Sequence, residues 1–219
     1  MAKRKPTNKY YFSVVGETEQ WYLKWLQDLI NNTEESVCKV SIDCPVKKNP
    51  LKHAKSLNVT RKIEIYHFFD YESDEPIHVQ GFQDAMDNMK KAEQLGKQIK
   101  YKSGYSNFTF DLWILLHMAD CNTSYAHRKQ YITLINRAFC EKFENMDEYK
   151  HEGNFKRCLS KMNLVNVIDA IKRARNIMQR NQENGYTLLQ YKGYRYYKEN
   201  PSLSAWEAIE KILSDCKLL

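Results

Sequence analysis

Residues Lys9-Tyr10-Tyr11-Phe12-Ser13-Val14-Val15-Gly16-Glu17-Thr18-Glu19 decide the fold that we expect for this chain. Residues 9–15 are rich in aromatic and β-branched side chains, which predicts a β-strand. Gly16 predicts a turn and Thr18 an N-cap, and apolar residues then recur at helical spacing: Trp21, Tyr22, Trp25, Leu26, Leu29 and Ile30. A strand, a glycine turn and a helix in this order are typical of α/β proteins, whose ligand sites gather at the carboxyl ends of parallel strands.

The rest of the chain continues this alternation as far as residue 117. Further strands are predicted at residues 37–44, 62–69 and 98–102, and helices at residues 50–57, 79–95 and about 107–117. The helix at 79–95 should bury Phe82, Met86, Met89 and Leu95. This order predicts a parallel sheet with helices on both faces.

The remainder is expected to be mainly helical. Helices are predicted at residues 125–143, 155–162, 164–181 and 201–213, with a basic, aromatic loop or hairpin at residues 190–198. We therefore expect an α/β core over residues 1–122 and a helical extension over residues 123–219.

Composition limits the class of protein. The 219 residues are 42% hydrophobic and 13% aromatic, which is enough for a packed core. No apolar run reaches the roughly 18 residues of a membrane span, and the basic start leads into a strand rather than a signal core. The six scattered cysteines lack ligand spacing, so reduced core thiols are favoured over a disulfide frame or a zinc-bound regulator. We expect a cytoplasmic protein without a membrane partner.

The charge is distributed unevenly. The chain carries +7, with 17 basic against 16 acidic residues up to residue 120 and 17 against 11 beyond it. A basic half beside an acidic cluster suits a polyanion held near metal ions. Charge that serves only solubility is the alternative.

An acidic cluster directly follows the predicted strand at 62–69. Asp70, Glu72 and Asp74 lie within a few residues, and in extended chain Asp70 and Glu72 point to the same side. Two carboxylates on one side can share a hard cation such as Mg²⁺. The alternative is a solvated acidic loop.

The segment Ser106-Asn107-Phe108-Thr109-Phe110-Asp111-Leu112-Trp113-Ile114-Leu115-Leu116-His117 is a dense apolar run. Ser106 and Asn107 are expected to cap a buried helix that follows. A buried Asp111 needs a metal, a cation or a backbone cap, because an unpaired carboxylate is costly in an apolar interior. Asp111 and His117 could also be purely structural hydrogen-bonding residues.

Basic residues recur in the second half of the chain. Lys172, Arg173 and Arg175 fall on one predicted helix, while Lys192, Arg195 and Lys198 alternate with tyrosines in the predicted hairpin. Aromatic faces with cations suit single-stranded nucleic acid. The alternative is a hairpin whose tyrosines pack on the core. The basic tail at residues 3–5 could add affinity.

Three segments together resemble the RloB family: residues 14–19, 68–75 and 106–117. Relatives carry Ser-Asn-x-x-Phe-Glu-x-Trp-x-x-x-His, and here Asp111 replaces the Glu. The family is bacterial, is associated with phage defence and has a fold similar to TOPRIM, the metal-dependent phosphotransfer fold. The resemblance implies Mg²⁺ or Mn²⁺ on Asp70 and Glu72, with Asp74 as a competing ligand. It also implies an AAA-type ATPase partner. Because the helix after residue 106 starts at a strand's carboxyl end beside Asp70, His117 could contact phosphate or act in proton transfer.

One position departs from that pattern. The first strand of TOPRIM proteins usually ends in Glu-Gly, often extended to Glu-Gly-x-Thr-Glu, and Val15 stands where the first Glu would be. The chain could be an inactive variant, Glu19 or Glu17 could have taken over the role, or the fold could serve binding only. Glu19 is the preferred substitute, since it falls in the first helical turn. For both glutamates, favourable charge at a helix N-terminus is the structural alternative.

The resemblance thus implies a metal-dependent nuclease that cleaves DNA or RNA in anti-phage defence. The competing expectation is a catalytically inactive subunit that binds nucleic acid or an ATPase. The sequence does not decide between DNA, tRNA and other RNA.

Overall fold

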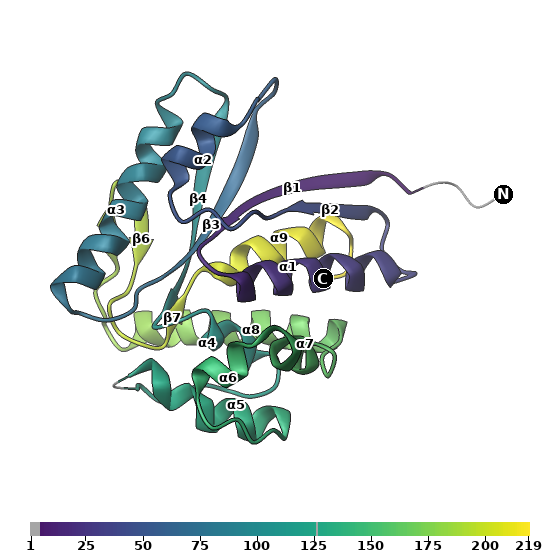
Figure 1. Cartoon of the computed structure of the whole chain (residues 1–219), viewed down its shortest axis with the longest axis vertical. Helices are drawn as coiled ribbons and strands as arrows, with labels where there is room; N and C mark the ends of the chain where they lie inside the picture. The colour runs from purple at the N-terminus through teal and green to yellow at the C-terminus, as the bar shows by residue number, and fades with distance from the viewer. Residues whose placement is uncertain (1–4, 126) are drawn as a thin grey trace.

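The computed structural model describes residues 5–125 and 127–219. In these residues a five-stranded sheet has the order β2-β1-β3-β4-β7 (Figure 1). The strands are β1 (Thr7–Val14), β2 (Lys39–Asp43), β3 (Ile63–Asp70), β4 (Ile99–Asn107) and β7 (Ser202–Leu203). The first four run parallel, and β7 pairs antiparallel with the end of β4. The expected α/β fold is confirmed, and the expected parallel sheet is found apart from the short antiparallel β7.

Helices cover both faces of this sheet, as predicted. One face packs on α1 (Glu17–Asn32) and α9 (Ala205–Asp215), with Phe12, Val14 and Leu26 among the side chains of the larger buried cluster. The other face packs on α2 (Pro50–Ser56) and α3 (Pro76–Glu93). Phe82, Met86 and Met89 of α3 are buried as expected, whereas Leu95 lies beyond the helix and is only partly buried.

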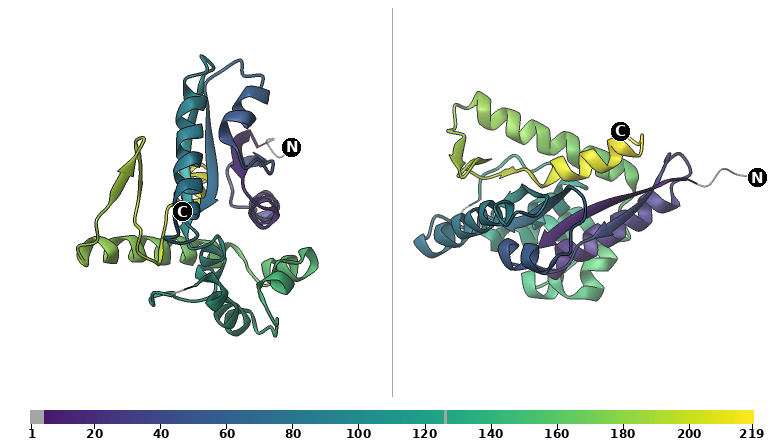
Figure 2. Two further views of the ribbon diagram at one scale, coloured as in Figure 1. Left: turned by 60° about the vertical axis from the view of Figure 1, so that its left-hand side comes forward. Right: turned by 90° about the horizontal axis from the view of Figure 1, so that it is seen from above.

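The helical part of the chain lies beyond the carboxyl ends of the strands (Figures 1 and 2). It contains α4 (Asp111–Leu116), the 3₁₀ turn η1 (Arg128–Gln130), α5 (Tyr131–Phe139), α6 (Met146–Lys150), α7 (Glu152–Leu159) and α8 (Leu164–Glu183). The predicted hairpin is present as β5 (Leu189–Tyr191) and β6 (Tyr194–Tyr196). The helical part shares the larger buried cluster with β1 and α1, so it helps to fix the strand ends.

Two expectations around β4 were wrong. The strand does not end at residue 102 but continues through Ser103 and Gly104 to Asn107. A Cβ on Gly104 would lie 2.4 Å from the Phe68 ring, so this glycine permits close packing inside a strand. Ser106 and Asn107 therefore end a strand and do not cap a helix, and α4 begins only at Asp111. All of α4 is buried, as predicted.

Other element boundaries also differ from the sequence pattern. Gly16, not Thr18, takes the N-cap position of α1. The helix expected over residues 125–143 is η1 followed by α5, which ends where Cys140 adopts a left-handed φ of 52°. Helix α6 and strand β7 were not predicted, because both are too short to show periodicity.

The six cysteines are free thiols. Five of them are buried, and only Cys140 among the six is exposed. Their role is therefore mainly to fill the core.

Candidate active site: a carboxylate cluster at the strand ends

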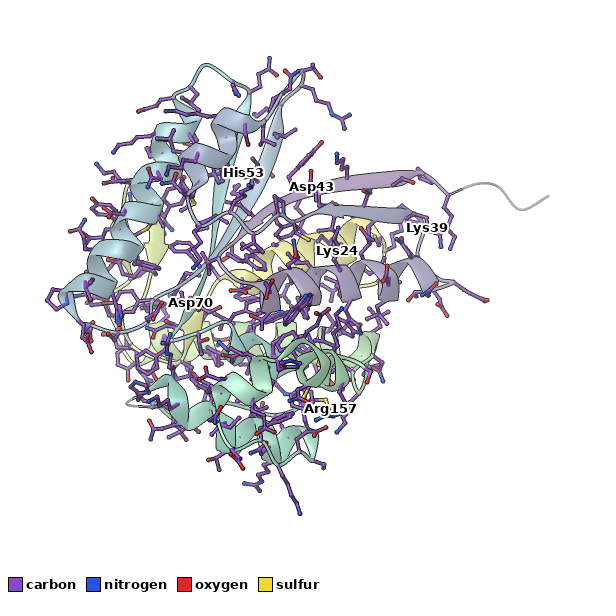
Figure 3. The ribbon with its side chains drawn as sticks, in the orientation of Figure 1. Lys24, Lys39, Asp43, His53, Asp70 and Arg157 are labelled. Carbon is purple, nitrogen blue, oxygen red and sulfur yellow. The ribbon has the colours of Figure 1, made fainter. Side chains whose placement is uncertain are left out.

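Three parallel strands deliver acidic residues to one end of the sheet. Glu19 lies in the first turn of the helix that follows β1, Asp70 ends β3, and Asp111 begins the helix that follows β4. Asp70 lies where the sheet meets the helical part (Figure 3). A cavity of about 580 Å³ at this place is lined by Glu19, Asp70 and Lys150, among others. Functional groups thus gather at the carboxyl ends of the strands, as the fold favours.

Glu19 lies against the turn that leads into α1. Its carboxylate accepts a hydrogen bond of 2.9 Å from the Thr18 hydroxyl, and the side chain is only 3% exposed. A Cβ on Gly16 would lie 2.8 Å from a Glu19 carboxylate oxygen, so the glycine makes room for this carboxylate. Burial raises the pKa of Glu19, and the nearby charge of Asp111 adds to the effect.

Asp70 is partly exposed to the cavity. Burial, followed by the charges of Glu19 and Asp111, holds the pKa of Asp70 well above its ordinary value. The three carboxylates therefore repel one another, and the cluster favours either a shared proton or a cation.

Asp111 is fully buried and pairs with a cation, as burial of a carboxylate requires. One oxygen, Oδ2, lies 2.8 Å from Lys150 Nζ and accepts a 2.8 Å hydrogen bond from the Thr109 hydroxyl. The other, Oδ1, is buried without a hydrogen-bond partner among residues 5–125 and 127–219. This oxygen has unused capacity to accept a hydrogen bond or a metal ion.

Lys150 is the site residue that the sequence did not reveal. It is the last residue of α6, and its side chain is 35% exposed. Burial would lower the pKa of its ammonium, but Asp111 and then the other carboxylates raise it overall, so the group stays charged. Nothing in the local sequence distinguishes it from other surface lysines, because its partner is a residue of α4.

The carboxylate oxygens of this cluster are the kind of ligand that a divalent cation such as Mg²⁺ takes. In the described part of the chain, no group of three or more His, Cys, Asp or Glu side chains is arranged as a ready metal site. Mg²⁺, however, is usually held by one or two carboxylates together with water and phosphate oxygens. The repulsion between the carboxylates fits such an ion, which Glu19 and Asp70 would meet in the cavity, whereas Asp111 is buried behind the cavity lining.

The other predicted acidic residues lie around this cluster. Glu72 lines the cavity, but its carboxylate accepts a 2.8 Å hydrogen bond from Arg128. Glu17 lines the cavity and is exposed. Asp74 accepts a 2.6 Å hydrogen bond from the Tyr71 hydroxyl and does not line the cavity.

His117 is placed in the core instead of the cavity. Its Nδ1 donates to the Trp113 carbonyl at 2.9 Å, so its Nε2 accepts from the Tyr22 hydroxyl at 3.1 Å. Burial lowers the pKa of His117 to about 4, so the ring is neutral near pH 7.

The predicted nucleic-acid-binding residues divide into two groups. On α8, Arg173 donates to the carbonyls of Leu116 and His117, and Arg175 pairs with Glu210. Lys172 is exposed and lies 3.5 Å from Asp169. At the hairpin, Lys192 pairs with Asp87 at 3.3 Å, while Arg195 and Lys198 are exposed. Residues 3 and 4 of the basic tail lie outside the described residues.

Fold and site together define an α/β protein with a carboxylate cluster at the carboxyl ends of its parallel strands. A profile of the RloB-like protein family matches residues 12–212, and the chain belongs to that family. The match extends well into the helical part, beyond the three segments that carry the resemblance. No curated protein and no solved structure matches the chain. Among the described helices, none has the length and apolar character that crossing a membrane requires.

Proposed function

We propose that this RloB-like chain is a divalent-metal-dependent nuclease of the TOPRIM type that cleaves nucleic-acid phosphodiesters in bacterial anti-phage defence. The observation that carries the proposal is that Glu19, Asp70 and Lys150 line one cavity, beside the buried Asp111 that pairs with Lys150. Clusters of this kind at strand ends suit phosphodiester chemistry, in which charge on phosphate oxygens must be neutralised.

The residues have separate roles in this proposal. Asp70 would hold Mg²⁺ or Mn²⁺ together with Asp111 or Glu72, and the bound ion would neutralise charge that develops on phosphate oxygens. Glu19, with its raised pKa, suits the transfer of a proton to or from the reacting oxygen. Lys150 suits contact with a phosphate oxygen beside the cluster.

The departure at Val15 is offset by its neighbours. Val15 is partly buried and lines the same cavity as Glu19 and Asp70. The bare Cα of Gly16 lets the carboxylate of Glu19 approach the same region. We therefore assign to Glu19 the role that the glutamate at the end of the first strand has in TOPRIM proteins.

A catalytically inactive subunit that binds nucleic acid or an AAA-type ATPase is the second candidate. Its support is that protein cations already neutralise two of the carboxylates: Lys150 pairs with Asp111, and Arg128 pairs with Glu72. A cytoplasmic location and partnership with an ATPase belong to both candidates.

Cleavage of a panel of DNA and tRNA with Mg²⁺ or Mn²⁺, with and without an ATPase encoded beside the gene, separates the two. The variants are Val15→Glu, Asp70→Ala and the double variant. The nuclease proposal expects cleavage by the unmodified chain or by Val15→Glu, and loss of that cleavage with Asp70→Ala. If neither cuts under any of these conditions, the binding subunit becomes the better account.

A further inference from the structure

Two adjoining cavities follow the outer edge of β4 beside the hairpin. One, of about 400 Å³, lies between α3, β4 and β6, and the other, of about 490 Å³, lies between α8, α9 and the hairpin. They share Arg195, Ser204 and Glu207, and we call the combined feature the β4-edge groove. In Figure 2 the hairpin stands beside α3, on the side away from β1 and β2. Among the described residues, the lining of the groove has no member in common with that of the carboxylate cavity.

The lining of the groove is strongly basic. Its cations are Lys90, Lys100, Lys102, Arg175, Lys192 and Arg195, against the acidic Glu93 and Glu207. Within residues 5–125 and 127–219, the side chains of Lys100, Lys102 and Arg195 form no ion pair or hydrogen bond. These three cations can therefore contact a ligand without breaking an existing pair.

Aromatic surface accompanies the charge. Trp206 is partly buried, and the guanidinium of Arg175 lies 5.6 Å from the centre of its ring. Tyr194 is also only partly buried. Cations beside aromatic rings are the usual surface for unpaired nucleotides, whose bases stack and whose phosphates pair with the cations.

The edge of β4 does not favour an added peptide strand. The backbone N–H of Tyr101 donates to the Glu93 carboxylate at 3.0 Å, and that of Tyr105 donates to the Ser204 hydroxyl at 3.1 Å. The Ser204 hydroxyl in turn donates to the Ser103 carbonyl at 3.2 Å. Side chains thus satisfy groups that a new strand would need, and lysines on an edge strand oppose pairing.

We propose that the β4-edge groove binds the sugar–phosphate backbone of single-stranded nucleic acid. The inference rests on the proposed function, for which it supplies a substrate-binding surface separate from the carboxylate cluster. The unpaired cations Lys100, Lys102 and Arg195 contact phosphates, and the aromatic side chains accept bases. Recognition of this kind depends on charge and stacking, so it is largely independent of sequence.

The test measures salt dependence by fluorescence anisotropy with labelled single-stranded DNA and RNA in EDTA, between about 50 and 200 mM salt. The variant Lys100→Glu/Arg195→Glu is compared with Arg61→Glu/Lys62→Glu. Both variants replace one arginine and one lysine by glutamate, so the change in charge is the same. Arg61 and Lys62 are exposed, form no ion pair in the described residues and line a different cavity. The logarithm of the binding constant falls linearly with the logarithm of the salt concentration, and each phosphate contact on a single strand contributes about −0.7 to that slope. The groove variant removes two such contacts, so the magnitude of its slope should be smaller by about 1.4. We expect at least a tenfold loss of affinity in the groove variant and a much smaller loss in the control.

Three results would overturn the inference: no binding by the unmodified chain, equal loss in both variants, or an unchanged slope in the groove variant. A fourth result would also overturn the inference. If the groove variant lost binding of polyglutamate but kept the affinity of the unmodified chain for nucleic acid, an acidic protein partner would be the better account. The proposed function is tested separately by Asp70→Ala. That variant should lose cleavage and keep the salt slope, so failure at the groove and failure at the cluster are distinguishable.

Discussion

Replacement of Lys150 tests whether its ammonium group stabilises the buried carboxylates around it. Removing one partner of a buried ion pair costs about 3–5 kcal/mol, since a buried charge is left uncompensated. The Asp111 side chain is only 1% exposed but that of Lys150 is 35% exposed, so solvent screens part of the interaction. We therefore expect Lys150→Met to lower the free energy of unfolding by about 2–3 kcal/mol at pH 8. Lys156→Met, which breaks an exposed pair with Glu152 on α7, should cost about 0.5 kcal/mol or less.

The loss in the free energy of unfolding of Lys150→Met should also depend on pH. Glu19 and Asp70 have raised pKa values in the folded chain, so the folded state binds more protons than the unfolded state above about pH 4. Stability conferred by these protons is lost as the pH rises through the folded pKa values. Without Lys150 the repulsion is stronger, so the deficit of Lys150→Met should be largest at pH 8 and shrink toward pH 5.

Urea unfolding of both variants at pH 5 and pH 8 provides the measurement, with the free energy obtained by linear extrapolation. Asp111→Asn combined with Lys150→Met should recover much of the loss, since it removes the uncompensated charge. A deficit of about 0.5 kcal/mol or less that does not change with pH would refute the electrostatic account of the cluster.

Three further predictions concern single residues. Asp70→Asn should raise the free energy of unfolding by about 0.5–2 kcal/mol at pH 8 and by less at pH 5, because it removes a carboxylate that its neighbours repel. The same urea experiment measures this change, with Asp74→Asn as the control. His117 has a pKa lowered from 6.5 to about 4, so the unfolded state binds more protons and stability is lost as the pH falls through that window. His117→Asn should show a smaller loss across that pH range, and an identical pH profile would exclude this role. Cys140 should react with an alkylating reagent much faster than the five buried thiols, as peptide mapping after a short exposure would show.

The sequence predicted those features that depend on local pattern. The strand–turn–helix at residues 9–30, a strand leading to the acidic cluster, and the buried Phe82, Met86 and Met89 of α3 are present. Each is long enough for its periodicity to be visible, and each follows the ordinary preferences of its residues. The position of acidic residues at strand ends followed from the predicted order of strands and helices.

Features that depend on tertiary contacts were missed. The sequence pattern ended the fourth strand at residue 102, but β4 continues through Ser103 and Gly104 because Gly104 fits against the Phe68 ring. Strand β7 exists only because Ser202 and Leu203 pair with the end of β4. Lys150 could not be recognised, since its partner Asp111 is distant in sequence and a short helix positions it.

Nuclease chemistry at the carboxylate cluster requires that the cluster bind a divalent cation. Titration of Mn²⁺ into the metal-free chain, followed by electron paramagnetic resonance, measures this without requiring activity or a partner. We expect saturable binding that weakens at least tenfold in Asp70→Asn and is unchanged in Asp74→Asn. No saturable binding, or equal binding by all three proteins, would contradict the metal-site account and leave the chain as a binding subunit.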